Sequence, residues 1–196
     1  MTDHLPLLNR RETVARLLCD RGEMLVVSGL GAATYDVAAA GDDPRNFYLW
    51  GAMGGTAAMA LGLALAQPER PVLAITGDGD MLMGMGSLAT IGARRPANLS
   101  VVVLDNEVYG ETGAQPTAIA KGVDLVTVAR GCGLEAPDDI RDMNGVGTLA
   151  ERIHRPDGPF LANIKIDTHE YVRVLPARDG AWLRTRFREA VLGGAP

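Results

Sequence analysis

Three short segments rich in glycine and polar residues hold the side chains most suited to chemistry. They are Ser28–Gly31, Gly77–Asp80 and Asp105–Gly110. Each follows an apolar run of the kind that forms a strand buried on both faces. Because ligands bind beyond the carboxyl ends of the strands in an open parallel sheet, we expect the three segments to meet at one site.

Asp78 and Asn106, which lie 28 positions apart, could together hold a divalent cation. Mg²⁺ prefers oxygen ligands in an octahedral array. One carboxylate, one carboxamide and one main-chain carbonyl, assigned here to Val108, leave positions for diphosphate oxygens and a water. Gly-Asp-Gly and Asp-Asn are also common in turns, and only their occurrence together at two strand ends favours a metal site.

The glycines of these segments favour phosphate binding of a particular kind. Gly77 and Gly79 allow close approach of the backbone, and a helix expected from Met81 to about Ala93 would point its first amides at the anion. A dinucleotide fingerprint is excluded because Gly29-Leu30-Gly31 and Gly77–Gly79 both lack its third glycine. A P-loop is excluded because Gly-Lys-Ser/Thr does not occur.

The elements that must position these residues alternate along the chain. Apolar runs predict the following strands: Met24–Ser28, Phe47–Trp50, Val72–Thr76, Leu99–Leu104 and Phe160–Ile166. Helical patterns lie between them, and a polar loop is expected from Asp105 to Thr117. This alternation predicts a doubly wound α/β fold, with a mostly parallel sheet and helices on both faces, in a single domain over residues 1–196.

Charge and composition limit the partners. The net charge of −5, without a Lys/Arg cluster, argues against nucleic acid and anionic membrane surfaces. The apolar stretch from Gly51 to Ala66 is too short to span a bilayer, and no signal peptide is visible at the start. Cys19 and Cys132 match no metal-ligand spacing. We therefore expect a cytoplasmic protein that acts on small molecules.

These motifs resemble those of thiamine-diphosphate enzymes. Gly77-Asp78-Gly79 with Asn106 is similar to the metal motif of that superfamily, and Trp50–Gly54 resembles the segment before a helix in its decarboxylases. The resemblance implies thiamine diphosphate and Mg²⁺ as cofactors. It also implies that the Gly51 carbonyl accepts a hydrogen bond from the aminopyrimidine and that Met53 wedges the cofactor into its bent shape, whereas Met53 taken alone would suit a core. The cofactor contacts expected from it are Gly29, Leu30, Gly51, Met53, Gly77, Gly79, Asp80, Tyr109 and Gly110.

The run from Phe47 to Thr117 is similar to the β chain of sulfopyruvate decarboxylase and to the C-terminal half of phosphonopyruvate decarboxylase. The pieces that carry the likeness are Leu82–Gly92, Leu104–Gly110 and Gly113–Thr117. The resemblance implies the β chain of a two-chain 2-oxo acid decarboxylase, a carboxy-lyase that converts sulfopyruvate or phosphonopyruvate to an aldehyde and CO₂.

The same resemblance implies that this chain is incomplete as a catalyst. In the superfamily the glutamate that activates the cofactor belongs to a pyrimidine-binding domain, so no catalytic residue is expected here. We expect a pyrimidine-binding α chain and a hetero-oligomer with at least two of each chain. Helix Gly54–Ala66 is expected at an interface through its apolar face, which consists of Ala57, Ala60, Leu61, Ala64 and Leu65.

Two departures from the family pattern bear on substrate. Asp80 stands where many relatives have a serine, so it either turns away from the diphosphate, for example as the N-cap of the following helix, or weakens diphosphate binding. Thr112 lies near the place of the active-site glutamate of pyruvate decarboxylases, which favours a differently charged substrate. Thr112, Gln115 and Thr117 offer neutral donors to a second anion, although the loop could simply be closed by Pro116.

Other functions remain compatible with these motifs. They are a thiamine-diphosphate carboligase, the β chain of a 2-oxo acid oxidoreductase, and a non-catalytic binding subunit in which Asp80 marks lost activity. The oxidoreductase would normally accompany iron–sulfur ligands, and two distant cysteines argue against a cluster in this chain.

Overall fold

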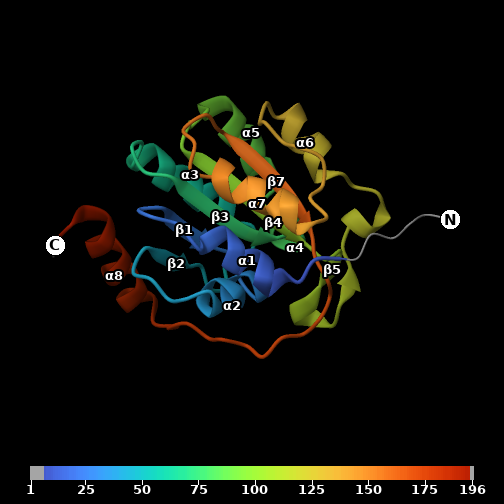
Figure 1. Cartoon of the computed structure of the whole chain (residues 1–196), viewed down its shortest axis with the longest axis horizontal. Helices are drawn as coiled ribbons and strands as arrows, with labels where there is room; N and C mark the ends of the chain where they lie inside the picture. The colour runs from blue at the N-terminus through green and yellow to red at the C-terminus, as the bar shows by residue number, and fades with distance from the viewer. Residues whose placement is uncertain (1–6, 195–196) are drawn as a thin grey trace.

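The protein, seen here in a computed structural model that describes residues 7–194, is built around one parallel sheet (Figure 1). The spatial order of its strands is β2-β1-β3-β4-β7, and every neighbouring pair is parallel. The bounds are β1 Leu25–Ser28, β2 Asn46–Tyr48, β3 Val72–Gly77, β4 Leu99–Asp105 and β7 Phe160–Lys165. A short antiparallel pair, β5 Val108–Tyr109 and β6 Gln115–Pro116, lies within the loop that follows β4.

Helices cover both faces of the sheet. One hydrophobic cluster includes α1 Arg10–Leu18, α2 Ala32–Ala39 and α7 Met143–Arg152; the other includes α3 Thr56–Ala66, α4 Asp78–Met83, α5 Gly86–Arg94 and α6 Leu125–Gly131. Single 3₁₀ turns occur at η1 Gly110–Thr112 and η2 Ile119–Lys121. The predicted doubly wound α/β fold is therefore confirmed, while a single domain over all 196 residues stays a prediction.

The strands are largely apolar because both of their faces are covered. Val26 and Ile75 belong to the cluster on one face, and Val27 and Ala74 belong to the cluster on the other. This arrangement explains why the sequence shows continuous apolar runs rather than the alternation of a half-exposed strand.

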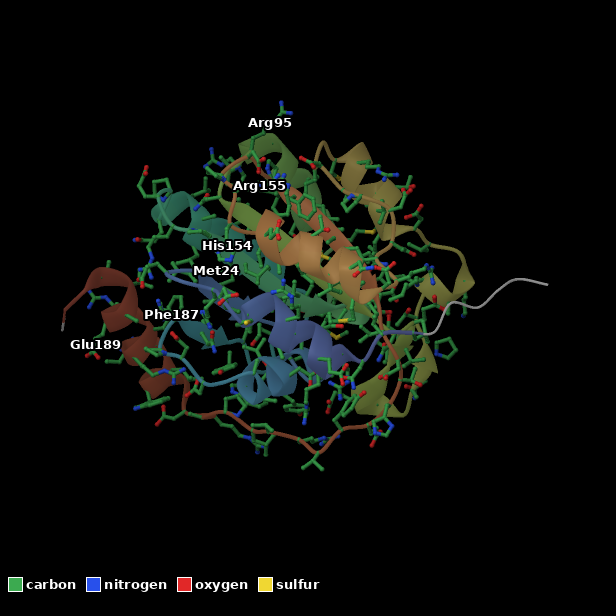
Figure 2. All side chains as sticks on the ribbon, in the orientation of Figure 1. Met24, Arg95, His154, Arg155, Phe187 and Glu189 are labelled. Atoms are coloured by element: carbon green, nitrogen blue, oxygen red, sulfur yellow. The ribbon has the colours of Figure 1, made fainter. Side chains whose placement is uncertain are left out.

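The last helix, α8 Gly180–Leu192, returns to the opposite edge of the sheet from β7 (Figure 1). Phe187 points from α8 toward the sheet and packs edge-on against Phe47 of β2, with 5.4 Å between ring centroids, whereas Glu189 lies on the exposed side (Figure 2). An edge strand covered in this way is protected from pairing with another chain.

The connections around β1 create a crevice. The chain leaves β1 through α2 on one face to reach β2, and it then returns through α3 on the other face to reach β3. Such a reversal of strand order opens a ligand-binding crevice at the carboxyl ends of the two central strands. Ser28–Gly31 and Gly77–Asp80 both lie there, as the sequence predicted.

The helix expected from Met81 to Ala93 is in fact two helices. The first, α4, begins at Asp78 and is capped by Gly77, so the expectation that Asp80 is an N-cap is wrong. The first helix ends at Gly84, where a side chain would not fit, since a Cβ there would lie 2.1 Å from the carbonyl oxygen of Gly54. Because Gly84 has no side chain, the loop that precedes α3 can pack directly against its backbone.

The apolar face of α3 that we expected at an interface is largely covered by this chain's own sheet. Four of its five residues, Ala57, Ala60, Leu61 and Ala64, are buried, and only Leu65 is exposed. The choice of that face was wrong because the sheet needs it. That this helix lies at an interface with another chain stays a prediction.

Two expectations concern segments or properties outside the site. Residues 1–6, on which the absence of a signal peptide was judged, lie outside the described residues. Within residues 7–194, no helix combines the length and apolar character needed to cross a bilayer.

Candidate functional site

A cavity of about 650 Å³ opens where β1, β3 and β4 end. It brings together side chains and backbone from all three segments that the sequence marked. The predicted site residues that line it are Leu30, Met53, Gly77, Asp78, Gly79, Asp80, Asn106, Val108, Tyr109, Gly110 and Thr112. The remaining four, Gly29, Gly51, Gln115 and Thr117, are not among its lining residues.

Asp78 is buried at the floor of this cavity without a cationic partner. Its side chain belongs to a residue only 2% exposed, and no salt bridge within residues 7–194 involves it. The hydroxyl of Thr117 donates to its Oδ2 at 2.7 Å. Burial raises the pKa of Asp78 to about 6; the nearby charge of Asp105 adds to the rise, and the Thr117 hydrogen bond opposes it. A buried carboxylate in this condition is suited to accept a cation.

Asn106 and Val108 form a fixed turn beside it. The Val108 amide donates to Oδ1 of Asn106 at 3.1 Å, and the Glu107 amide donates to Oδ1 of Asp105 at 3.1 Å. These two side-chain-to-backbone bonds are the local reason why Asp-Asn at a strand end makes a turn. The turn presents Asn106 and Val108 at the cavity wall.

The donor set suits a hard divalent cation. Within the described part of the chain, no group of three or more His, Cys, Asp or Glu residues could hold a metal ion. Asp78, the Asn106 carboxamide and the main chain of Val108 are oxygen donors at the cavity that a cation could take together with oxygens of bound phosphate and water. An oxygen-only set with several positions left to ligand oxygens is what Mg²⁺ binds in proteins.

Asp80 has a different environment from Asp78. Its carboxylate accepts hydrogen bonds from the Gly54 amide, from the Thr76 hydroxyl and, at 2.7 Å, from the Thr56 hydroxyl. Gly29 is also explained, since a Cβ there would lie 2.5 Å from Oδ2 of Asp80. Asp80 therefore ties the loop before α3 to β3. The sequence analysis missed its donors Thr56 and Thr76, whose only signal is a hydroxyl that can donate.

The space beside the backbone differs between Gly77 and Gly79. A Cβ on Gly79 would lie 2.5 Å from Cε1 of Tyr109 and 3.6 Å from Cε of Met53, so the tyrosine ring occupies that space. A Cβ on Gly77 would have no neighbour within 4 Å. Met53 lines the cavity and is 37% exposed, so its interpretation as a core residue is wrong. A wedge role for Met53 stays a prediction.

The loop proposed to recognise substrate is a small hairpin. The Thr112 hydroxyl donates to Oε1 of Gln115 at 2.9 Å, and Nε2 of Gln115 donates to the Thr112 carbonyl at 2.8 Å. Thr117 is buried and engaged with Asp78. Of the three predicted substrate residues, only Thr112 reaches the cavity, and contact with an anion stays a prediction for all three.

Lys165 is a residue that the sequence analysis missed. Its ammonium group lies 2.7 Å from Oδ2 of Asp105 and 2.6 Å from Oε1 of Glu107. Although burial opposes it, hydrogen bonds to these two carboxylates raise the pKa of Lys165, which keeps it charged. The available signal was a lysine inside the mostly apolar strand Phe160–Ile166.

Comparisons with known proteins agree with this geometry. Residues 29–164 match the family described as "Thiamine pyrophosphate enzyme, C-terminal TPP binding domain". The chain is 38% identical over 160 residues to sulfopyruvate decarboxylase subunit beta of Methanothermobacter thermautotrophicus, which is 82% of this chain and 83% of that subunit. It is 40% identical over 141 residues to phosphonopyruvate decarboxylase of Streptomyces viridochromogenes, which is 72% of this chain and 35% of that enzyme.

A solved structure shows the same fold. An enzyme from Mycobacterium smegmatis, described as thiamin diphosphate-dependent, superposes with a TM-score of 0.70 at 20% identity, over 82% of this chain and 32% of that one. The chain thus spans about a third of the length of this enzyme and of the phosphonopyruvate decarboxylase, but most of the sulfopyruvate decarboxylase subunit. With its predicted motifs gathered at one cavity and more than half of its length matched by one family model, the chain belongs to the family of thiamine pyrophosphate enzymes, as a C-terminal TPP binding domain.

Proposed function

We propose that this chain is the β chain of a two-chain thiamine-diphosphate-dependent 2-oxo acid decarboxylase. The substrates that we assign are sulfopyruvate or phosphonopyruvate, and the products are the corresponding aldehyde and CO₂. The observation that carries the proposal is the buried, unpaired Asp78 facing a cavity that Asn106 and Val108 also line. The names of the relatives and their coverage of this chain support the substrate class.

Mg²⁺ is the cation that we assign to Asp78, Asn106 and the Val108 carbonyl. The cavity lining within the described residues contains no Lys, Arg or His, while Asp78, Asp80 and Glu111 all line it. A diphosphate placed there would be repelled unless a cation balanced the charge. A divalent cation bound there would balance the negative charge of the diphosphate, and it would also offset the buried charge of Asp78.

Thiamine diphosphate supplies an electron sink that stabilises the carbanion formed when a 2-oxo acid loses CO₂. The residues of this chain hold it. We assign the diphosphate to the backbone near Gly77 and Gly79, and the remaining contacts to Gly29, Leu30, Gly51, Met53, Asp80, Tyr109 and Gly110. The role that we assign to Gly29 is mainly to make room for Asp80, because the absence of a side chain on Gly29 leaves the space that the Asp80 carboxylate fills.

The partner that we propose is a pyrimidine-binding α chain, in a hetero-oligomer with at least two of each chain. Two of the residues that line the cavity, Met53 and Met83, have exposed side chains. Exposed apolar side chains beside an open cavity are typical of a surface that another chain covers. We assign the activating glutamate to that partner and no catalytic residue to this chain. A cytoplasmic location, with Cys19 and Cys132 both unpaired, belongs to the same proposal.

Substrate recognition is assigned to the loop from Gly110 to Thr117. Thr112 would face the second anion directly, Gln115 would hold Thr112 in place, and Thr117 would act through Asp78. A sulfonate or phosphonate that leaves water needs such donors.

The test is to purify this chain with a candidate α chain and to measure CO₂ release from sulfopyruvate, phosphonopyruvate and pyruvate. The proposal expects turnover of a dianionic substrate that requires both thiamine diphosphate and Mg²⁺. Cofactor binding without turnover of any 2-oxo acid would favour a non-catalytic subunit. Transfer of the two-carbon unit to a second carbonyl compound, or electron transfer to an acceptor, would favour the carboligase or the oxidoreductase.

A further inference from the structure

One buried ammonium group holds the turn that carries Asn106. The side chain of Lys165 is 8% exposed, and it bridges Asp105 and Glu107, the two residues that flank Asn106 in the chain. No other side chain in the described residues forms salt bridges to both of them. The two ion pairs of Lys165 therefore hold the residues on either side of Asn106.

The backbone of this turn needs such support. Glu107 has φ +63°, in the left-handed region that residues with a side chain rarely adopt. Such a conformation is unfavourable and persists only where the surroundings hold it. The Glu107 carboxylate is 45% exposed and has Lys165 as its anchor. Without that anchor, the turn could relax and move the Asn106 side chain and the Val108 carbonyl.

The anchor itself is rigid because it belongs to the sheet. Asp105 and Lys165 are paired residues of the neighbouring strands β4 and β7. Asp105 also accepts a hydrogen bond from Nδ2 of Asn163 at 2.8 Å, and this nitrogen donates to Asp139 as well. Through its ammonium group, Lys165 thus ties Glu107, in the loop after β4, to the paired strands β4 and β7.

We propose that Lys165 is a positioning residue of the cation site, which sets the geometry of Asn106 and Val108 through Asp105 and Glu107. This inference rests on the proposed Mg²⁺ site. Partners that orient metal ligands from behind typically change metal affinity by 10–100-fold when they are removed.

The sign of the effect separates positioning from simple electrostatics. Lys165 carries a positive charge close to the proposed cation, so removal of that charge alone would strengthen Mg²⁺ binding. Loss of positioning weakens it. A weaker affinity in a variant without the ammonium group therefore has to come from the geometry of the ligands.

The experiment measures the Mg²⁺ affinity of the full chain by calorimetric titration in the presence of thiamine diphosphate, alone and with the partner chain added. Lys165→Met is the test variant. Lys121→Met is the matched control, since Lys121 is the only other lysine and is exposed. We expect Mg²⁺ to bind Lys165→Met about 10–100-fold more weakly and Lys121→Met within about two-fold of the wild type.

A second measurement distinguishes positioning from general damage. At saturating Mg²⁺, the affinity of Lys165→Met for thiamine diphosphate should return close to the wild-type value, and Lys165→Arg should recover part of the Mg²⁺ affinity. If Lys165→Met does not fold, Glu107→Gln is compared with Glu111→Gln, which removes the same charge from the cavity margin without touching Lys165. The Glu107 variant should then bind Mg²⁺ at least about three-fold more weakly than the Glu111 variant.

Unchanged or tighter Mg²⁺ binding in Lys165→Met, or equal effects of the two glutamate variants, would overturn the inference and leave the proposed function standing. A wild-type chain that binds thiamine diphosphate without any need for Mg²⁺ would overturn the metal site and this inference together.

Discussion

Asp78 and Asp80 lie two positions apart on α4 and are both buried, yet their surroundings have little in common. Asp80, 6% exposed, receives hydrogen bonds from three donors on the loop before α3, on α3 and on β3. Asp78 receives one side-chain hydrogen bond, from Thr117, and its pKa is raised to about 6. The comparison teaches that burial alone does not identify a functional carboxylate. The number of donors that the protein supplies to it does.

The difference follows from where each carboxylate points. The Asp80 carboxylate accepts hydrogen bonds from the elements that build the cavity, and these bonds stabilise the folded chain. Asp78 is left with a desolvation cost that the protein offsets only in part, and a bound cation would offset the rest. One carboxylate is thus a structural anchor, and the other is a candidate ligand.

The largest effect is expected from removal of the anchor. Asp80→Ala leaves the Gly54 amide and the hydroxyls of Thr56 and Thr76 without their acceptor, which should lower the free energy of unfolding by about 3–5 kcal/mol. Urea denaturation of the full chain measures it. Asp78→Asn is the control and should be at least as stable as the wild type without metal. Equal losses in both variants would erase the distinction between the two aspartates.

The neighbouring glycines should differ in the same way. Gly79→Ala pushes a Cβ into the Tyr109 ring and should cost about 1–3 kcal/mol, whereas Gly77→Ala meets nothing within 4 Å and should change stability by less than about 0.5 kcal/mol. Thermal denaturation of both variants without cofactor provides the comparison. A stable Gly79→Ala would mean that Tyr109 moves away at little cost.

The smallest effect is a pH dependence that only Asp78 should produce. Because its folded pKa of about 6 lies above the ordinary aspartate value, the folded chain binds the proton more tightly than the unfolded chain. The cost of the buried charge is present above pH 6 and fades as the pH falls through 6. Relative to Asp78→Asn, the metal-free wild type should therefore gain about 1 kcal/mol of stability between pH 7 and pH 5. Parallel pH profiles of the two proteins would contradict the raised pKa.

The parts of the fold and site that could be predicted from sequence are those set by local pattern. Continuous apolar runs predicted the strands, and the rule that strand ends meet at one edge predicted a shared site for Asp78 and Asn106, which line the same cavity. Gly77 and Gly79 were both read as phosphate contacts, but only the structure shows that the Tyr109 ring fills the space above Gly79.

What sequence could not supply were contacts between distant elements. The bond from Gly54 to Asp80 spans 26 positions and depends on how the loop before α3 packs on α4. That same packing leaves no room for a side chain at Gly84, where α4 ends. The role of Lys165 follows from the register of β4 and β7, which pairs it with Asp105. The pattern of residues along one segment does not show which distant residues will pack against it.

The central claim is that Asp78 binds the cation that holds the cofactor diphosphate. It is tested most directly by titrating Mg²⁺ into wild-type and Asp78→Asn protein at a fixed concentration of thiamine diphosphate and measuring both affinities by calorimetry. Asparagine keeps the shape and an acceptor for the Thr117 hydroxyl but removes the charge. The account predicts Mg²⁺ binding at least about ten-fold weaker in Asp78→Asn; an affinity equal to that of the wild type would contradict it.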